Sequence, residues 1–297
     1  MRQARRFGGA AEHIGHRRRD VGRDRHRGVG SASAQASAEG GGVVASDQPG
    51  AIVSEFTHQA DAFARAAVYQ LAATLDALLD SVPLSPNQRW LDVACGPGIV
   101  TRALAGRVGE AVGVDITPAM LEKARADAAG IANARFVLGD ATALPFPDGG
   151  FDGALTRFSL HHIPAPARVL REMARVVVTG GYMAAADHLT SSETSAAAWH
   201  HDIERLRDPS HWLSLSPEVF FGLGEPLGLR LVTRQVVPFD LDFEEWLTRG
   251  SGGAANRGVI EALLAAPPAG SAEVFAVSGG RLHVSLGLAV WQRVSRP

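Results

Sequence analysis

Apolar residues recur at steps of three and four from Ile52 onward, the spacing of one face of an α-helix. Phe56, Leu71 and Leu79 belong to this pattern. It predicts one or two helices within residues 51 to 85, ahead of the first strand. After residue 88 the pattern changes to short apolar runs separated by amphipathic stretches, which indicates strands alternating with helices.

Five short apolar runs follow one another and predict strands. They are "RWLDVA", "EAVGVD", "ARFVLGD", "FDGALTRF" and "YMAAAD". Helices are expected between them, over about residues 99 to 107, 118 to 130 and 165 to 178. Thr117 is the expected N-cap residue of the second helix, and Gly130 is expected to end it. Strands that are joined through helices of this length pair in parallel.

Two later runs, "LRLVTRQVVPF" and "RLHVSLGLAVW", predict further strands, with helical stretches between them near Glu244 and Ile260. "TSSE" at 190 to 193 resembles a capping box and would open a helix that runs toward Leu206. The expected fold is α/β. It is a Rossmann-like, doubly wound sheet of seven mostly parallel strands with an antiparallel last strand, preceded by N-terminal helices and carrying a partly helical insertion over residues 189 to 270.

Charge is distributed unevenly along the 297 residues, whose net charge is -2. Residues 1 to 30 hold nine Arg against three acidic residues, a balance of +6, which leaves -8 for residues 31 to 297. That acidic balance argues against nucleic acid as a partner. Residues 1 to 50 have almost no large apolar side chains and cannot offset the entropy of ordering, so a disordered tail is expected. The domain would then span residues 51 to 297.

Cys95 is the only cysteine, which excludes an intrachain disulfide and a cysteine-based zinc cage. A reducing, cytoplasmic setting is the natural expectation for such a chain. No apolar run precedes Val43, so we expect neither a secretory signal nor a membrane span.

The stretch "LDVACGPG" at 91 to 98 forms a glycine-rich turn after the first predicted strand. A dinucleotide fingerprint would place a third glycine where Thr101 stands. The turn instead follows the pattern acid, any residue, Gly or Ala, any residue, Gly, any residue, Gly. Its members are Asp92, Ala94, Gly96 and Gly98. Small residues let a ligand approach the backbone, and free amides at the next helix start favour a carboxylate.

Acidic residues also stand at the ends of the next two predicted strands. Asp115 ends "VGVD" and is followed by Ile116, and "GDATALPF" supplies Asp140 and Ala141. Helix caps or a loop acid could explain each carboxylate alone. Three at successive strand ends lie together at the carboxyl edge of the sheet, where open α/β sheets bind ligands.

These motifs, together with "RFSLHHIPAP" and "VLREMARVVVTGGYMAAAD", resemble class I S-adenosylmethionine-dependent methyltransferases, most of all the ubiquinone/menaquinone-type branch that acts on small molecules. Ala94 in place of the first Gly, and "VTGG" in place of "KPGG", depart from the usual pattern. The resemblance implies that Asp92 faces the amino group of the cofactor, Asp115 the ribose hydroxyls and Asp140 the adenine. The implied cofactor-binding residues are Asp92, Ala94, Gly96, Gly98, Asp115, Ile116, Asp140, Ala141 and Arg157.

Methyl transfer is an in-line displacement that needs a base only when the acceptor carries a proton to be removed. Imidazole suits that task near neutral pH, so His161 and His162 after the fourth strand are the candidate catalytic residues. They could instead bond to backbone and shape the pocket. Arg157, Asp187 and His188 are further candidates at this edge. His200, His201 and Asp208 are interpreted as a solvated helix face with a turn cap, and no metal site is expected.

Residues 189 to 270 stand where such enzymes carry their acceptor-binding segment. Its aromatic residues are expected to form mostly core, with some lining an apolar cleft shared with the N-terminal helices. They are Trp199, Trp212, Phe220, Phe221 and Trp246. The expected function is methyl transfer to a small, apolar or aromatic metabolite. Two alternatives remain: a cyclase or decarboxylase of natural-product biosynthesis on the same fold and, less favoured, an RNA methyltransferase.

Overall fold

The computed structural model describes residues 47 to 70 and 72 to 295. The tail predicted over residues 1 to 50 lies outside this range except at its end, where the chain is helical. The first helix, α1, begins at Gln48, three residues before the predicted domain boundary. Within residues 47 to 70 and 72 to 295, no helix combines the length and apolar character that crossing a membrane requires.

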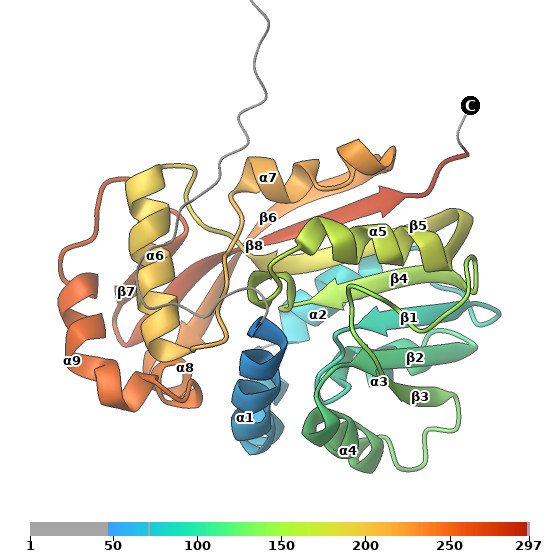
Figure 1. The fold of residues 1–297 in the computed structure, drawn as a ribbon, viewed down its shortest axis with the longest axis horizontal. Coiled ribbons are helices and arrows are strands. Elements are labelled where there is room, and N and C mark those ends of the chain that lie inside the picture. The colour runs from blue at the N-terminus through green and yellow to red at the C-terminus, as the bar shows by residue number, and fades with distance from the viewer. Residues whose placement is uncertain (1–46, 71, 296–297) are drawn as a thin grey trace, which may run out of the picture. The chain divides into compact units, whose positions relative to one another are not determined.

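The described strands form one mixed sheet in the order β3-β2-β1-β4-β5-β8-β6, with β7 paired to β8 (Figure 1). β1 to β5 pair in parallel, and β8 runs antiparallel to its neighbours β5, β6 and β7. The strands are β1 (Arg89–Val93), β2 (Glu110–Asp115), β3 (Ala134–Leu138), β4 (Phe151–Arg157), β5 (Val177–His188), β6 (Arg230–Asp242), β7 (Phe275–Ser278) and β8 (Arg281–Gln292). The predicted α/β, mostly parallel architecture is confirmed.

The sheet has eight strands rather than the seven expected. The additional strand is β7, which pairs with β8 through a two-residue turn formed by Gly279 and Gly280. Both glycines have positive φ, 56° and 73°, as the two central residues of a tight hairpin turn require. A Gly-Gly pair between two apolar runs indicates a β-hairpin, but the predicted strands do not include β7.

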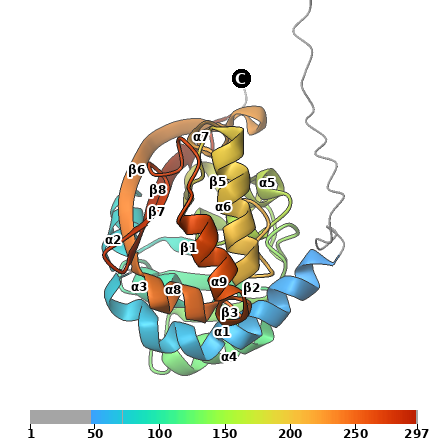
Figure 2. The same cartoon turned by 90° about the vertical axis from the view of Figure 1, so that its left-hand side faces the viewer.

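Helices cover both faces of the sheet (Figures 1 and 2). Residues of α2 and α3 belong to one buried cluster, and residues of α5 and α7 to the other. The helices α6, α8 and α9 lie beyond β7, at one end of the sheet (Figure 1). Their bounds are α1 (Gln48–Gln70), α2 (Ala72–Asp80), α3 (Ile99–Ala105), α4 (Pro118–Asp127), α5 (Pro166–Val176), α6 (Thr194–Arg207), α7 (Pro217–Gly222), α8 (Phe243–Arg249) and α9 (Gly253–Leu264), with 3-10 turns η1 (Leu160–His162) and η2 (Glu225–Leu227).

Two helix ends differ from their predictions. The capping box expected at 190 to 193 is wrong, because α6 begins at Thr194 with Glu193 as its N-cap residue. Thr190 cannot serve as the cap, since its backbone bonds to Leu215 and its hydroxyl contacts a histidine ring of α6. Helix α4 begins at Pro118 after Thr117 as predicted, but it ends at Asp127, before the expected Gly130.

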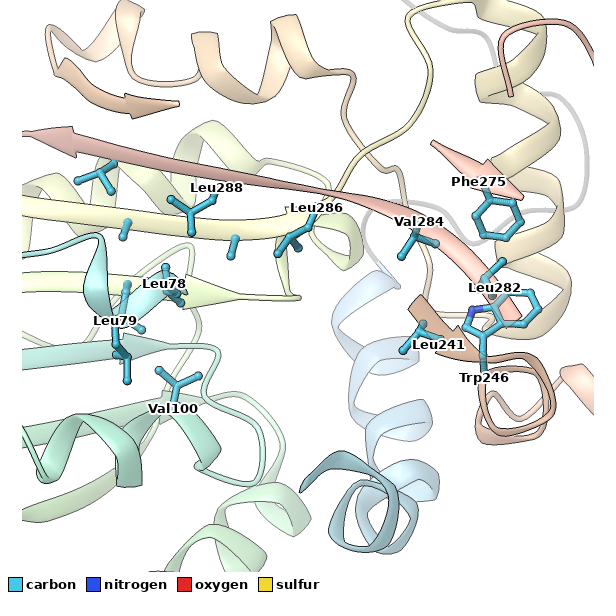
Figure 3. Packing of buried hydrophobic residues seen from close by; sticks show 14 of the residues in the cluster. Leu78, Leu79, Val100, Leu241, Trp246, Phe275, Leu282, Val284, Leu286 and Leu288 are labelled. Atoms are coloured by element: carbon cyan, nitrogen blue, oxygen red, sulfur yellow. The ribbon is translucent and has the colours of Figure 1, made fainter. Parts of the chain in front are cut away.

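Strand β8 joins the core of the parallel sheet to the helices that follow β5. Figure 3 shows its side chains in a row along one face, with Leu286 and Leu288 toward α2 and Leu282 and Val284 toward Trp246. All of them are buried. Alternate residues of a strand point to one face, so a single strand connects both parts of this cluster. The segment from residue 189 to 270 is thereby packed against the sheet edge.

Leu286→Ala is expected to lower the free energy of unfolding by about 2 to 5 kcal/mol, because the side chain is 1% exposed and its loss leaves a cavity in this cluster. Urea unfolding followed by circular dichroism measures the change. The matched control is Val236→Ala on the neighbouring strand, which is 52% exposed and should change stability by less than about 0.5 kcal/mol. Equal effects in the two variants would contradict the assigned packing.

Candidate active site

The glycine-rich turn leaves β1 through three residues in the left-handed backbone region. They are Ala94 (φ 56°), Gly96 (φ 51°) and Gly98 (φ 75°). A Cβ atom at Gly98 would lie 2.7 Å from the ring of Phe136, so only glycine fits there. A Cβ atom at Gly96 would meet nothing within 4 Å. The turn is therefore closed on the side of the sheet and open on the other.

Asp115 at the end of β2 holds this turn in place. Its Oδ2 accepts a hydrogen bond from the Gly96 amide and its Oδ1 accepts one from the Thr117 amide, each at 2.8 Å. Burial raises the pKa of Asp115, while these amide bonds lower it, and the net shift is upward. Each carboxylate oxygen has two lone pairs, so both can accept one more hydrogen bond from the cavity that Asp115 lines.

Asp92 lies behind the turn, and the residues lining the adjacent cavity do not include it. Its Oδ2 accepts a hydrogen bond from the Thr101 hydroxyl at 2.6 Å, and burial raises its pKa to about 7. Thr101 is the residue found where a dinucleotide fingerprint has its third glycine. Asp92 thus supports the turn from below, and its contact with a cofactor stays a prediction.

Asp140 follows β3 and is exposed at the cavity wall, while Ala141 beside it is buried. The Asp140 Oδ1 atom accepts hydrogen bonds from the amide and hydroxyl of Thr142, at 2.7 and 2.9 Å. This local turn fixes the direction of the carboxylate at the carboxyl edge of the sheet.

Arg157 at the end of β4 also lines the cavity. Its Nη2 donates to the Thr74 hydroxyl of α2 at 2.7 Å, and its guanidinium lies 4.6 Å from the centre of the Phe158 ring. Burial lowers the pKa of Arg157 to about 10, and the charge of Asp92 opposes this shift. The side chain therefore remains cationic at neutral pH.

These strand ends enclose a cavity of about 290 Å³, to which α1 and the chain after β4 add the other walls. Among the predicted cofactor-binding residues, Asp92 and Gly98 lie behind the wall. The others line it: Ala94, Gly96, Asp115, Ile116, Asp140, Ala141 and Arg157. The expected sharing of the cleft with the N-terminal helices is seen in α1, which lines the cavity with Gln48, Ile52 and Phe56, although the sequence did not assign these three residues to the site. Gln48 was assigned to the tail, yet it is 1% exposed and donates to the carbonyls of His162 (2.9 Å) and Ser210 (2.6 Å).

A second cavity of about 70 Å³ shares Phe56, Phe158 and His162 with the first. Ten of its fourteen lining residues have polar side chains, among them four histidines, two acids and two arginines. The lining residues are Phe56, Gln59, Phe158, His161, His162, His188, Glu204, Arg207, Asp208, His211, Ser214, Leu241, Trp246 and Arg249. The five aromatics of this segment are expected to form mostly core, with some lining a cleft; Trp199, Phe220 and Phe221 are buried in the core clusters, and Trp246 lines the second cavity.

The interpretation of His200 and His201 as a solvated helix face is wrong, whereas Asp208 does cap the turn after α6, where its Oδ1 accepts from the amide and hydroxyl of Ser210. The side chains of His200, His201 and Asp208 are 1%, 6% and 2% exposed, because α6 is covered by α9 and by Phe275 of β7, which lies 4.1 Å from the His200 ring. Sequence spacing alone could not indicate this burial, which depends on residues distant along the chain. No group of three or more potential ligands in the described residues is arranged to hold a metal ion.

The two candidate catalytic histidines have different surroundings. His161 Nδ1 lies 2.5 Å from Asp187 Oδ1; burial lowers the pKa of His161, but the Asp187 carboxylate raises it more, so the net shift is upward. His162 Nδ1 lies 3.0 Å from the Ser210 hydroxyl. Burial and the charge of His161 lower the pKa of His162 to about 4.

The central part of the chain matches a known family. Residues 91 to 185 match the family described as "Methyltransferase domain". The uncharacterized methyltransferase YcgJ of Bacillus subtilis (strain 168) is 29% identical over 204 residues, covering 68% of this chain and 80% of that protein. A demethylmenaquinone methyltransferase of Staphylococcus aureus (strain MRSA252) is 40% identical over 98 residues, which are 32% of this chain and 41% of that protein.

Solved structures agree with these matches. The crystal structure of YcgJ has a TM-score of 0.69 at 25% identity and covers 75% of this chain and 99% of its own. The [4+2]-cyclase SpnF has a TM-score of 0.54 at 18% identity, covering 75% of this chain and 82% of its own; that likeness concerns the fold alone. Residues 91 to 185 therefore form a methyltransferase domain, and the glycine turn, the sheet order and these similarities identify an S-adenosylmethionine-dependent methyltransferase with the class I fold.

Proposed function

We propose that this methyltransferase acts on a small, apolar or aromatic metabolite whose reacting end enters where the two cavities meet. The supporting observation is the shared wall of Phe56, Phe158 and His162. On one side this wall adjoins the first cavity, which contains the strand-end residues and is called the cofactor cavity below. On the other side it adjoins the second cavity. A pair of aromatic walls suits a flat acceptor.

The cofactor cavity fits S-adenosylmethionine, because backbone at Gly96 faces open space and Asp115 has lone pairs directed into the cavity. When bound, this cofactor supplies an electrophilic methyl group on a positively charged sulfur. In the proposed arrangement Asp115 accepts the two ribose hydroxyls, and Asp140 and Ala141 meet the adenine ring. Arg157 would attract the carboxylate of the methionine part.

Helix α1 forms one wall of this cavity and, in the proposed arrangement, helps to keep water from the bound reactants. Gln48 anchors the start of the helix to the backbone of residues 162 and 210. Further along, Glu55 accepts a hydrogen bond from the Ser251 amide at 2.9 Å, and Gln59 donates to Asp208 at 3.1 Å. Exclusion of water favours the displacement, since the acceptor then has no competitor for the methyl group.

The purified protein should bind S-adenosylmethionine and its demethylated product but not NAD. The reason is that Thr101, in place of the third glycine of a dinucleotide turn, is bonded to Asp92. Isothermal calorimetry with the three ligands measures this. Preferential binding of NAD would overturn the proposed arrangement of residues around the turn.

The acceptor is tested by incubating the protein with methyl-labelled S-adenosylmethionine and a metabolite extract, then searching for labelled small molecules by mass spectrometry. Label in a small aromatic or apolar product supports the proposal. Conversion of a metabolite without label would favour the cyclase or decarboxylase alternative, which the same fold can host. Label recovered only in RNA would favour the third candidate.

A further inference from the structure

One of the four histidines in the second cavity is held by a carboxylate in a fixed orientation. Asp187, at the end of β5, is 2% exposed. Its Oδ2 accepts a hydrogen bond from the Leu160 amide at 2.7 Å, with the amides of residues 159 and 161 at 3.2 and 3.3 Å. Its Oδ1 accepts from the His188 amide at 2.7 Å and faces His161 Nδ1 at 2.5 Å.

This arrangement fixes the tautomer of His161. The amide bonds favour the ionised carboxylate of Asp187, and an ionised carboxylate can only accept hydrogen bonds. His161 Nδ1 therefore carries the hydrogen, and the lone pair of the neutral ring resides on Nε2. Nothing in residues 47 to 70 or 72 to 295 is hydrogen-bonded to Nε2, and His161 lines the second cavity.

Two other histidines of this cavity have ring nitrogens engaged with neutral groups. His162 Nδ1 contacts the Ser210 hydroxyl, and His211 Nε2 lies 3.2 Å from His201 Nδ1. The pKa values of His162 and His211 are lowered by burial and by neighbouring histidines, for His162 to about 4. Neither ring accepts a proton as readily as His161 near neutral pH.

We propose that His161, oriented by Asp187, is the general base of the methyl transfer, and that the acceptor is a weakly acidic hydroxyl compound such as a phenol or enol. This inference rests on the proposed function. The acceptor hydroxyl lies between Nε2 of His161 and the cofactor cavity, beside Phe158. The second cavity is small for a whole acceptor, since a cavity that binds benzene measures roughly 150 Å³, so it receives only the reacting hydroxyl.

The step balances without any further reactant. The O–H bond breaks and its proton moves to Nε2 of His161. The oxygen forms a bond to the methyl group as the methyl–sulfur bond breaks, and the electron pair of that bond stays on sulfur. Asp187 stabilises the resulting imidazolium, which gives its proton to water after the product leaves.

The charged and titratable groups around His161 determine the pH at which it can act. From β5 these are Asp187 and His188, from α6 Glu204 and Arg207, from α8 Arg249, and from η1 and the turn after α6 His162, Asp208 and His211. Their net effect raises the pKa of His161. A base must be unprotonated, so the turnover rate should increase as the pH rises through a value above about 6.5.

The test starts from the labelled product formed from methyl-labelled S-adenosylmethionine and the metabolite extract. We expect a methyl ether, identified by tandem mass spectrometry. Label on nitrogen, sulfur or carbon would overturn the inference while leaving the proposed function intact. No labelled product, or no cofactor binding by calorimetry, would instead contradict the proposed function itself.

Variants then separate proton transfer from structural support. His161→Gln and Asp187→Asn should each lower kcat by about 10²- to 10⁴-fold with cofactor Kd changed less than about threefold, and the rising pH limb should be lost in His161→Gln. The matched control is His283→Gln, whose partly exposed ring pairs with Asp240 of β6 at 2.9 Å, away from both cavities; its kcat should be unchanged. Unchanged kcat in folded His161→Gln overturns the inference. If that variant does not fold, a wild-type profile without the rising limb overturns it.

Discussion

Asp115→Ala is expected to weaken S-adenosylmethionine binding by about 2 to 4 kcal/mol, or roughly 30- to 1000-fold, since two hydrogen bonds to a charged group are lost. The same carboxylate accepts the amides of Gly96 and Thr117. Alanine therefore also leaves the glycine turn without its support at the end of β2. Calorimetry on the folded variant measures the affinity, and circular dichroism shows that the fold is retained.

Two further variants interpret this result. Asp115→Asn keeps one acceptor oxygen, so its affinity should lie between that of the parent and that of the alanine variant. Asp148→Ala removes a carboxylate that is bonded only to Arg175 at the protein surface, and it should leave the affinity unchanged. Parent-like affinity in Asp115→Ala would mean that the second-strand carboxylate does not hold the ribose.

The part of the site that the sequence predicted is the part made by strand ends. Residues such as Asp115 and Asp140 follow directly from a short apolar run, and parallel strands bring their carboxyl ends to one edge whatever the rest of the chain does. Local pattern is then enough to place them together, and both line the cavity. The roles assigned to them remain predictions.

The rest of the site depends on contacts between distant residues. Gln48 carries no local signal, yet it reaches the backbone of residues 162 and 210. His200 and His201 looked solvent-facing because their helix is amphipathic only in part, and their burial comes from α9 and β7. For the same reason the sequence "HHIP" does not indicate that His161 contacts a carboxylate and His162 a hydroxyl, since the partners Asp187 and Ser210 are distant along the chain.

The buried histidines predict that the protein loses stability in mild acid. Four buried histidines have lowered pKa values, mainly because burial disfavours the charged ring. The pKa is about 4 for His162 and His200 and about 3 for His188 and His201. An unfolded chain protonates its histidines near pH 6.5. As the pH falls from 6.5 toward 4, the unfolded state therefore binds protons that the folded state does not, and stability decreases.

Other groups oppose part of this loss. The pKa of Asp92 is raised to about 7 and that of His161 is also raised, so these groups bind protons in the folded state first and stabilise it as the pH falls. The pKa values of Glu204 and Asp208 are lowered to about 2; they stabilise the fold above the unfolded carboxyl pKa and lose that effect only below about pH 4.5. Between about pH 7 and 5.5 the buried histidines outnumber the groups whose pKa is raised, so we expect a net loss of stability.

Urea unfolding at several pH values between about 7 and 5.5 measures this loss. His200→Gln removes one buried titrating ring while an amide can still bond to the Thr190 hydroxyl, which lies 3.1 Å from His200 Nδ1. The slope of stability against pH should then fall by about half a proton at pH 6.5 and by about 0.9 proton at pH 5.5. The matched control is His58→Gln, at an exposed position of α1, which should leave the slope unchanged. A free energy of unfolding that stays constant over this range in the parent protein would show that these rings are already protonated in the folded state. The assumption that His162 and His211 are neutral would then be wrong, and the choice of His161 as the base depends on that assumption.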